Sequence, residues 1–249
     1  MGDARAIPKG TQPEGATSEQ DAARKVREMF TRIAPRYDLL NHLLSGQMDK
    51  RWRARTAKEL QPILGRADAM VLDLCCGTGD LAFSLAHGAK ARIIGADFSH
   101  TMLVRAREKN AGGVTFFEAD ALRLPFADGA FDLVTAAFGF RNLANYEEGL
   151  REIWRVLKPG GTLAILEFTE PAPGLIGDLY RFYCWKVLPV IGGMISGDAK
   201  AYRYLPKSVA RFYRPEEFVE VMKEVGYEQV RYVLMMMGTV AVHIGRKRA

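Results

Sequence analysis

The sequence has few cysteines and histidines. It contains three cysteines and four histidines in 249 residues. Cys75 and Cys76 are adjacent and cannot easily bridge each other, so a disulfide framework is excluded. The chain also lacks the spaced Cys and His pairs of a zinc site. This scarcity fits a reducing, cytoplasmic compartment and predicts that no metal is bound.

The sequence also lacks a long uninterrupted apolar run. The longest apolar stretch, residues 174–196, contains three charged residues and a proline, which argues against a membrane span. The first 20 residues have no apolar core of the kind found in a signal peptide. We therefore expect a soluble protein.

The composition is that of an ordinary globular protein with an excess of basic residues. Hydrophobic residues make up 48% and charged residues 26% of the chain, which is enough for a sizeable core. The net charge of +6 favours a negatively charged partner: a phosphate-bearing ligand, an anionic membrane or a nucleic acid. The sequence contains no appended nucleic-acid module and no aromatic-basic strand platform, so no nucleic-acid partner is expected.

The order of the secondary-structure signals predicts an α/β fold. Residues 1–17 mix Gly, Pro and polar residues and are predicted to be a disordered tail, with a helix starting at Ser18. Residues 18–249 are predicted to form one domain with three parts: an N-terminal helical lid (18–66), a ligand-binding core (67–170), and substrate-side helices with C-terminal strands (171–249). Strands are expected at 70–76, 91–97, 114–120, 131–140 and 162–168. Because helices alternate with these strands, the sheet should be parallel and covered on both faces. Two last strands that turn near Gly238 predict an antiparallel edge.

A glycine turn follows the first predicted strand in the segment VLDLCCGTGD. Gly77 and Gly79 lie at the carboxyl end of the sheet, where open α/β sheets bind ligands, and they allow close approach to the main chain. Asp97 ends the second strand, 20 residues beyond Gly77, where a carboxylate can accept both hydroxyls of a ribose. Asp120 and Ala121 end the third strand and are placed to meet an adenine edge.

Two ligands compete for this turn. A dinucleotide also uses a glycine turn and an acidic residue at this distance. Asp73 and Asp80 flank the turn, however, and they would repel a pyrophosphate and attract a cation, which favours S-adenosylmethionine. Phe98 and Met102 would supply apolar walls for the adenine. The adjacent cysteines are interpreted as small buried side chains between strand and turn.

Six segments carry a resemblance to a known family. They are DLCCGTGDLA, ADFSHTML, DALRLPFADGAFDLV, AFGFRNL, REIWRVLKPGGTLAILEF and SGDAKAYRYLPKSV. Together they resemble the bacterial quinone-biosynthesis C-methyltransferases, which comprise the demethylmenaquinone methyltransferases and their ubiquinone-pathway relatives. The first segment is typical of any S-adenosylmethionine methyltransferase, whereas FGFRNL and GDAKAYRYLP are far more specific. The resemblance extends from about residue 26 to residue 247.

The resemblance implies a Rossmann-like class I methyltransferase fold with a mostly parallel seven-stranded sheet. It also implies C-methylation of a polyprenylated quinol, either demethylmenaquinol in menaquinone biosynthesis or 2-methoxy-6-polyprenyl-benzoquinol in ubiquinone biosynthesis. By position, it implies donor contacts from Thr78, Asp97, and Asp120 with Ala121. Ala137 stands where some relatives have a serine, and residues 235–240 read MMMGTV where relatives often have Thr-Gly-Gly. The first departure removes any hydroxyl contact at that position, and the second changes the apolar wall of the substrate pocket and leaves the acceptor open.

Methylation of a quinol carbon needs a base or a phenolate partner beside two aligned reactants. Arg141 follows the fourth strand; since a guanidinium has too high a pKa to be an easy base, we assign it to phenolate stabilisation. Asn142 would orient the hydroxyl. The candidate bases are Tyr37, Asp38 and His42 in the lid. The alternatives are that the Arg-Asn pair only bonds loop carbonyls, that Asp38 is a helix cap, and that His42 is structural.

Several other residues have two interpretations each. Tyr202 and Tyr204 either line the quinol pocket or pack under the C-terminal helix. Glu167 either faces the crevice or pairs with an arginine. Residues 174–196 either contact the membrane and the isoprenoid tail or form a plain buried helix. The basic run at residues 50–55 either faces anionic lipid or is a solvated helix face.

Two other functions compete with quinol methylation. One is methylation of a different acceptor such as RNA, for which binding would be strongly salt-dependent. The other is a non-catalytic donor-binding protein, although the intact set of Asp73, Gly77, Gly79 and Asp97 argues that donor binding is retained. A polyprenylated acceptor implies peripheral contact with a membrane. The oligomeric state stays open, with a homodimer as one candidate.

Overall fold

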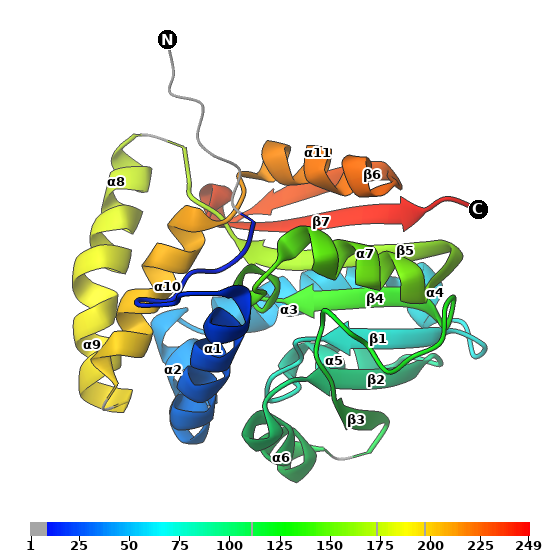
Figure 1. Cartoon of the computed structure of the whole chain (residues 1–249), viewed down its shortest axis with the longest axis horizontal. Coiled ribbons are helices and arrows are strands. Elements are labelled where there is room, and N and C mark those ends of the chain that lie inside the picture. The colour runs from blue at the N-terminus through cyan, green and yellow to red at the C-terminus, as the bar shows by residue number, and fades with distance from the viewer. Residues whose placement is uncertain (1–8, 111, 173, 197) are drawn as a thin grey trace.

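A seven-stranded sheet forms the centre of the computed structural model, which describes residues 9–110, 112–172, 174–196 and 198–249. The strand order is β3-β2-β1-β4-β5-β7-β6 (Figure 1). The strands are β1 (Met70–Leu74), β2 (Arg92–Asp97), β3 (Val114–Glu118), β4 (Phe131–Ala137), β5 (Leu157–Phe168), β6 (Tyr227–Met235) and β7 (Val240–Lys247). Strands β1 to β5 pair in parallel, whereas β7 lies antiparallel between β5 and β6. The predicted fold class, including its antiparallel C-terminal edge, is confirmed.

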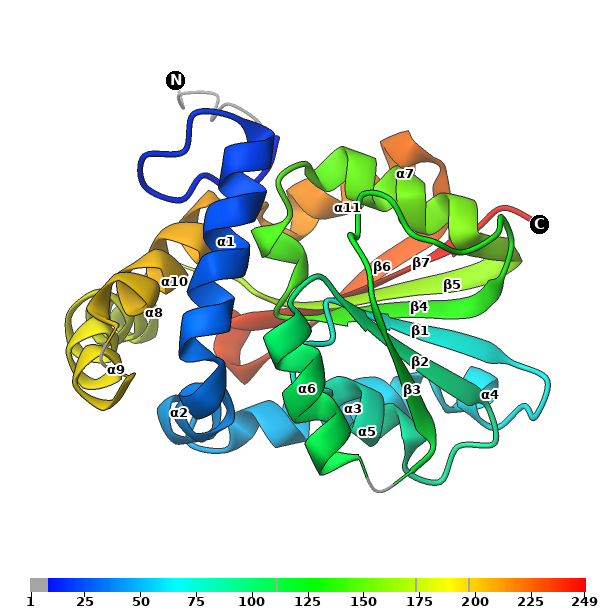
Figure 2. The ribbon, with the colours of Figure 1, turned by 60° about the horizontal axis from the view of Figure 1, so that its bottom comes forward.

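Helices cover both faces of the sheet. Side chains alternate between the two faces of a strand, so Leu72 and Leu74 of β1 belong to one buried cluster and Val71 to the other. The first cluster packs against α7 (Tyr146–Val156) and α11 (Pro215–Val225). The second cluster includes residues of α3 (Met48–Glu59), α4 (Gln61–Leu64), α5 (Asp80–Ala86) and α6 (His100–Lys109). Figure 2 shows these two layers on either side of the strands.

A further group of helices covers the carboxyl ends of the parallel strands (Figure 1). It consists of α1 (Glu19–Ile33), the short turn η1 (Ala34–Arg36), α2 (Tyr37–Leu44), α8 (Leu175–Phe182), α9 (Leu188–Ser196) and α10 (Ala199–Arg211). One π-helical turn, η3 (Tyr183–Val187), joins α8 to α9 without a break. Met29 of α1, Leu40 of α2, Leu188 of α9 and Tyr202 of α10 share one buried cluster. Segments from both ends of the chain therefore meet above the ligand end of the sheet.

Helix α1 begins where the sequence predicts it. The Ser18 hydroxyl accepts a hydrogen bond from the Asp21 amide at 3.1 Å, which is an N-cap. The buried positions recur at helical spacing: Ala22, Val26, Met29 and Ile33. The apolar stripe of α1 thus faces the other helices over the strand ends. We call this group of helices, α1, η1, α2, α8, α9 and α10, the helical cap.

Two predictions differ from the structure. Residues 9–17, predicted as part of a disordered tail, pack along the protein, and the buried Thr11 donates its amide to the Leu143 carbonyl at 2.8 Å. Residues 1–8 of that tail lie outside the described residues. Strand β5 begins at Leu157 rather than at residue 162, because Leu157 already pairs with Phe131 before a register shift. Within the described residues, no helix combines the length and apolar content needed to cross a membrane.

Candidate active site

The glycine turn after β1 has a backbone that only small residues tolerate. Gly77 and Gly79 have φ of 55° and 86°, in the left-handed region that favours glycine. A Cβ added at Gly79 would lie 2.9 Å from the Phe83 ring, so a side chain there would also displace that ring. Cys75 and Cys76 are partly buried, and burial raises the pKa of both thiols well above the usual range. Such thiols are poor nucleophiles, in agreement with a packing role.

Asp97 organises this turn from the end of β2. Its two carboxylate oxygens accept hydrogen bonds from the Gly77 and Ser99 amides, each at 2.8 Å. Burial raises the pKa of Asp97 to about 6, although these amide bonds lower it. Asp73, one strand away, accepts a hydrogen bond from the Thr135 hydroxyl at 2.8 Å, and burial raises its pKa to about 7. Two buried carboxylates therefore lie behind the turn, where they favour a cationic ligand.

A small cavity of about 70 Å³ opens in front of this turn. Six of the predicted donor-binding residues line it: Gly77, Asp97, Phe98, Met102, Asp120 and Ala121. The remaining predicted donor residues, Asp73, Thr78 and Gly79, are buried beside it and are not on its lining. The Thr78 hydroxyl instead donates to the Asp38 carboxylate in α2. We call this hollow the donor cavity.

A larger cavity of about 220 Å³ lies between the helical cap and the sheet. Its lining is mostly apolar and aromatic, and it includes the predicted residues Tyr37, Arg141, Tyr202 and Tyr204. We call it the acceptor cavity. The two cavities share three lining residues: Phe30, Tyr37 and Phe138. They are therefore adjacent, with these side chains at the junction.

Arg141 is almost fully buried at the acceptor cavity. Its guanidinium lies 2.7 Å from the Glu167 carboxylate, donates to the Phe138 carbonyl, and donates to the Ser208 hydroxyl at 3.3 Å. The interpretation of Glu167 as a carboxylate paired with an arginine agrees with this geometry. Arg141 also bonds one loop carbonyl, that of Phe138, as the alternative interpretation predicts. Its role toward a phenolate stays a prediction. Asn142 lies beside it and lines the donor cavity.

The three candidate bases occupy different places. Tyr37 lies at the junction of the cavities, and burial raises the pKa of its hydroxyl. Asp38 points toward the glycine turn, where it accepts from Thr78 and pairs with Lys109 at 2.8 Å. His42 pairs through Nδ1 with Asp49 at 2.8 Å and lines neither cavity. Of the three, only Tyr37 lines both cavities.

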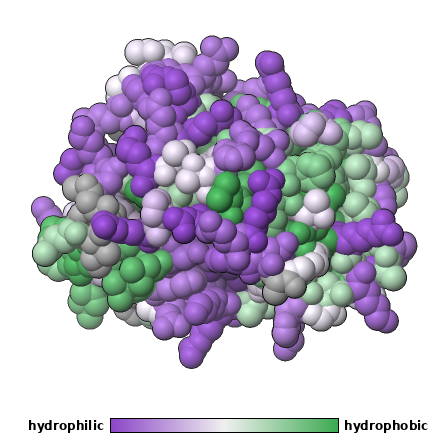
Figure 3. Space-filling view, turned by 90° about the horizontal axis from the view of Figure 1, so that it is seen from below, coloured by the Kyte–Doolittle hydropathy of each residue, from purple (hydrophilic) through white to green (hydrophobic). Residues whose placement is uncertain are grey.

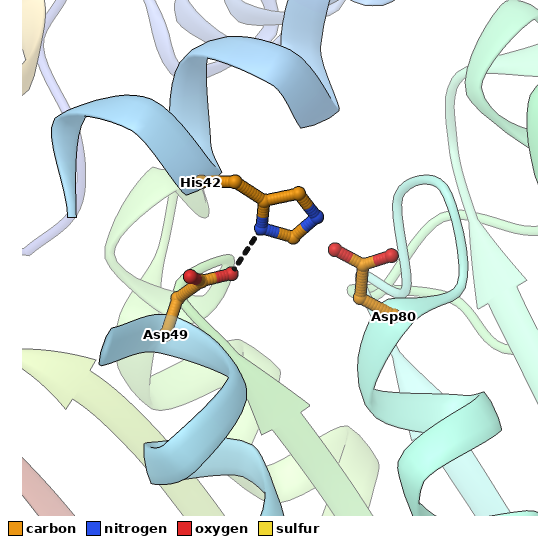
Figure 4. Close-up of side chains that lie close together, drawn as sticks. All are labelled: His42, Asp49 and Asp80. Carbon is orange, nitrogen blue, oxygen red and sulfur yellow. Dashed lines mark hydrogen bonds and ion pairs between the residues drawn. The ribbon is translucent and has the colours of Figure 1, made fainter. Parts of the chain in front are cut away.

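His42, Asp49 and Asp80 lie close together, with one ligand atom from each within 4.8 Å of the others (Figure 4). Cations from the protein already pair with both carboxylates. The Arg53 guanidinium contacts Asp49 and lies 3.5 Å from Asp80, and Lys109 lies 2.7 Å from Asp80. The cluster is therefore better described as an ion-pair network that joins α2 and α3 to α5 and α6.

The structure corrects one interpretation of the basic run at residues 50–55. Arg53 and Trp52 are buried, with Trp52 packed against Phe138 and Phe168 at ring-centroid distances of 5.9 and 6.1 Å. Arg53 is used in the ion-pair network, so the run is not a single lipid-facing surface. The sequence carried no signal for the burial of Trp52, because its partners Phe138 and Phe168 lie far along the chain.

The fold is that of class I methyltransferases. A solved structure described as an S-adenosylmethionine-dependent methyltransferase from Thermotoga maritima, possibly for histamine N-methylation, matches with a TM-score of 0.65 at 23% identity. It covers 90% of this chain and 100% of that chain. The [4+2]-cyclase SpnF matches with the same TM-score of 0.65 at 18% identity, over 97% of this chain and 99% of its own. At these identities the likeness concerns the fold alone.

The sequence comparisons define the family. The profile of the ubiE/COQ5 methyltransferase family matches residues 17–247. A demethylmenaquinone methyltransferase of Thermus thermophilus is 53% identical over 87% of this chain and 99% of its own length. One from Deinococcus radiodurans is 47% identical over 92% and 95%, and the ubiquinone/menaquinone biosynthesis C-methyltransferase UbiE of Pseudomonas fluorescens is 41% identical over 92% and 91%. The chain belongs to the ubiE/COQ5 methyltransferase family, and its predicted class, an S-adenosylmethionine-dependent C-methyltransferase, is confirmed.

Sequence reasoning missed several residues of the site. Phe30 and Phe138 form the junction of the cavities, and Asp49, Trp52 and Arg53 line the acceptor cavity. Phe138 lies within the AFGFRNL segment, where a buried aromatic after a strand was a usable signal. Phe30 lies in α1 and the other three lie in α3, and the packing of these helices against the rest of the protein cannot be read from local sequence.

Proposed function

We propose that the chain transfers a methyl group from S-adenosylmethionine to a ring carbon of a polyprenylated quinol, converting demethylmenaquinol to menaquinol. One observation carries this proposal: a small carboxylate-backed cavity adjoins a larger apolar cavity at Tyr37, Phe30 and Phe138. The carboxylates beside the first favour a cationic donor, and the lining of the second favours an apolar ring. The names of the two relatives at 53% and 47% identity support the naphthoquinol acceptor.

Donor binding is assigned to the residues around the glycine turn. Asp97 would accept the ribose hydroxyls, Asp120 and Ala121 would meet the adenine edge, and Phe98 and Met102 would enclose the ring. Bound there, S-adenosylmethionine supplies an electrophilic methyl group on a sulfonium. Asp73 and Asp97 lie behind the turn, and their charge favours this cation.

Acceptor activation is assigned to the side chains where the cavities meet. The ring carbon becomes nucleophilic when the neighbouring hydroxyl loses its proton, and the resulting phenolate needs fixed donors in a dry site. Arg141 and Asn142 would supply them, and Tyr37, whose raised pKa keeps its hydroxyl protonated, would add a third donor where the cavities meet. The aromatic lining excludes water and holds the ring against the donor.

The acceptor is tested by mass spectrometry with purified protein and S-adenosylmethionine. Reduced demethylmenaquinol and the methoxy-benzoquinol are offered separately in detergent, and we expect a methylated product from the naphthoquinol. Product only from the benzoquinol would move the protein to ubiquinone biosynthesis, which the relatives at about 41% identity also serve by name. Product from neither, with donor binding intact, would overturn the proposal.

We further propose that the protein works peripherally at a cytoplasmic membrane surface, through the outer face of α8 and α9. That face exposes Leu175 by 87%, Leu179 by 67%, Phe182 by 58% and Met194 by 82%. Figure 3 shows a hydrophobic area at the left edge, the side on which Figure 1 places these helices. A groove beside it combines apolar with basic residues: Trp185, Lys186, Pro189, Val190, Met194, Arg203, Pro206 and Lys207. Apolar area flanked by cations is complementary to an anionic bilayer.

A further inference from the structure

Residues 9–17 form a strap that crosses α10 and the start of α7. Three hydrogen bonds fix the backbone of its first part: Tyr146 N to Lys9 O at 2.8 Å, Thr11 N to Leu143 O at 2.8 Å, and Arg211 Nε to Gly10 O at 3.0 Å. Figure 2 shows this segment beside the upper end of α1. The strap therefore packs directly on the residues that follow Asn142, and two of these, Leu143 and Ala144, line the donor cavity.

The register of the strap is fixed sterically. Gly10 is buried, and a Cβ at this position would lie 1.7 Å from the Ala144 carbonyl oxygen. Such a distance is impossible for any residue with a side chain. The strap therefore cannot shift by one residue, which would place Lys9 or Thr11 at this position. Thr11, next to it, is 3% exposed, so its side chain lies in the protein interior.

The Thr11 hydroxyl begins a chain of hydrogen bonds that ends on Asn142. Thr11 Oγ1 lies 2.6 Å from the Tyr204 hydroxyl, and that hydroxyl lies 2.9 Å from Asn142 Oδ1. Burial raises the pKa of Tyr204 to about 12, so its proton stays in place at neutral pH. A phenol has one proton to donate, and Asn142 Oδ1 can only accept. Tyr204 must then donate to Asn142 and accept from Thr11.

The Phe138 carbonyl independently supports this orientation of the Asn142 amide. Asn142 Nδ2 lies 3.4 Å from the Phe138 carbonyl and donates to it. If the amide were flipped, its oxygen would face that carbonyl, and two acceptors would meet without a proton between them. An amide nitrogen carries two hydrogens, and Phe138 takes only one of them. Asn142 lines the donor cavity and Phe138 lines both cavities, so we expect the second hydrogen to face a ligand near their junction.

We propose that Thr11 and Tyr204 are positioning residues that hold Asn142 with its N–H, rather than its carbonyl, toward the acceptor oxygen. This inference rests on the proposed quinol methylation, because a developing phenolate needs a hydrogen-bond donor and is repelled by a carbonyl oxygen. The strap contributes Thr11 from a point 131 residues before Asn142. The N-terminal segment is thus part of the support of the reacting centre.

The test compares two substitutions of one side chain. Thr11→Val keeps the shape and removes the hydroxyl, whereas Thr11→Ser keeps the hydroxyl. We expect Thr11→Val to lower kcat about 3- to 10-fold, the equivalent of one hydrogen bond, with an unchanged Kd for S-adenosylmethionine, and Thr11→Ser to restore the rate. Thr115→Val, at an exposed strand position, is the matched control for the same chemical change. A Thr11→Val enzyme with the unmodified kcat would overturn the inference.

A double-mutant cycle separates positioning from a general loss of structure. In an Asn142→Ala background the Thr11→Val change should have no further effect on kcat, because the amide that it orients is gone. Full additivity of the two effects would contradict the inference. The side-chain amide resonances of Asn142, followed by NMR without any acceptor, should shift in Thr11→Val and not in Thr115→Val. If the unmodified protein methylates neither quinol, the proposed function fails, and this amide measurement still tests the strap.

Discussion

Asp73 and Asp97 are buried carboxylates that lie where a cation is expected to bind. Burial raises the pKa of Asp73 to about 7 and that of Asp97 to about 6, so ionising either group in the empty protein costs free energy. A bound sulfonium would recover part of this cost. We therefore expect donor binding to release protons from these two residues.

The Asp73→Asn variant should lose part of the pH dependence of folding. A raised folded-state pKa gives a stabilising contribution that is complete below pH 4, the unfolded value, and is lost as the pH rises through about 7. The free energy of unfolding of the unmodified protein should thus fall across this window by about 2–4 kcal/mol more than that of the variant. Urea denaturation at pH 4.5 and pH 7.5, without donor, measures the difference. Parallel curves for the two proteins would show that Asp73 is not the group responsible.

Arg141 cannot be tested by simple truncation, because Glu167 would then be left buried and unpaired. Removing one partner of a buried pair costs about 3–5 kcal/mol of stability. In the Arg141→Gln, Glu167→Gln double variant both charges are removed, and we expect near-normal stability, unchanged donor affinity and a rate at least about 100-fold lower. Calorimetry, thermal unfolding and turnover together make the measurement. Normal turnover in the double variant would show that Arg141 is only a structural residue.

At the scale of elements, the lid helix α2 is tied to the donor side of the sheet. Asp38 in α2 accepts from Thr78 and pairs with Lys109 of α6, which also pairs with Asp80 of α5 at 2.7 Å. These contacts are partly exposed and close over the glycine turn. Such contacts are suited to break and re-form as ligands enter.

Asp38→Asn should loosen the lid without unfolding the core. The substitution keeps the size of the side chain and removes its charge, so the bond to Lys109 weakens. We expect amide hydrogen exchange in residues 37–44 to rise several-fold while that of residues 146–156 stays the same. The Km for both substrates should rise as well. Unchanged exchange in the lid would mean that its apolar contacts alone hold it closed.

The elements of the sheet were predictable, whereas their long-range supports were not. Alternating strand and helix signals placed all seven strands, since each is set by local residues. The start of β5 was missed because the KPGG turn is part of a bulged strand that pairs through Leu157. The strap was missed because its contacts, such as Thr11 with Tyr204, join residues 193 positions apart. Local polarity gives no information about such contacts.

The same division applies to the site. The glycine turn, Asp97 and the end of β3 follow from strand ends, so the lining of the donor cavity was largely predictable. The acceptor cavity is built from α1, α2, α3 and α8 to α10, and its shape depends on how these helices pack. The ambiguity over Glu167 was resolved only by its 2.7 Å distance to Arg141.

At the scale of the whole molecule, the net charge of +6 and the apolar face of α8 and α9 predict two components of membrane binding. In a flotation assay, a larger fraction of the protein should float with anionic vesicles than with zwitterionic vesicles. This difference should disappear as the salt concentration is raised. Phe182→Ser should weaken binding to both kinds of vesicle. Replacing Lys186, Arg203 and Lys207 by Gln should remove the preference for anionic lipid.

The control for these charges is Arg92→Gln, at an exposed position where β2 begins, at the opposite end of the sheet. It should leave the lipid preference unchanged. If Phe182→Ser instead turns a dimer into a monomer in sedimentation analysis, the face is an interface between two copies of the chain. Equal flotation of all variants would contradict a membrane role for α8 and α9.

Trp185 and Pro206 line both the acceptor cavity and the outer groove, so the two hollows are separated by very little protein. If a quinol ring enters through this thin wall, its isoprenoid tail can remain in the lipid. Withdrawing a tail would cost about 0.8 kcal/mol for each methylene, and a cavity of about 220 Å³ is too small to receive a long one. Such an enzyme would handle only the head of its substrate and would be indifferent to tail length. A cell could then lengthen or shorten its quinones without changing the methyltransferase.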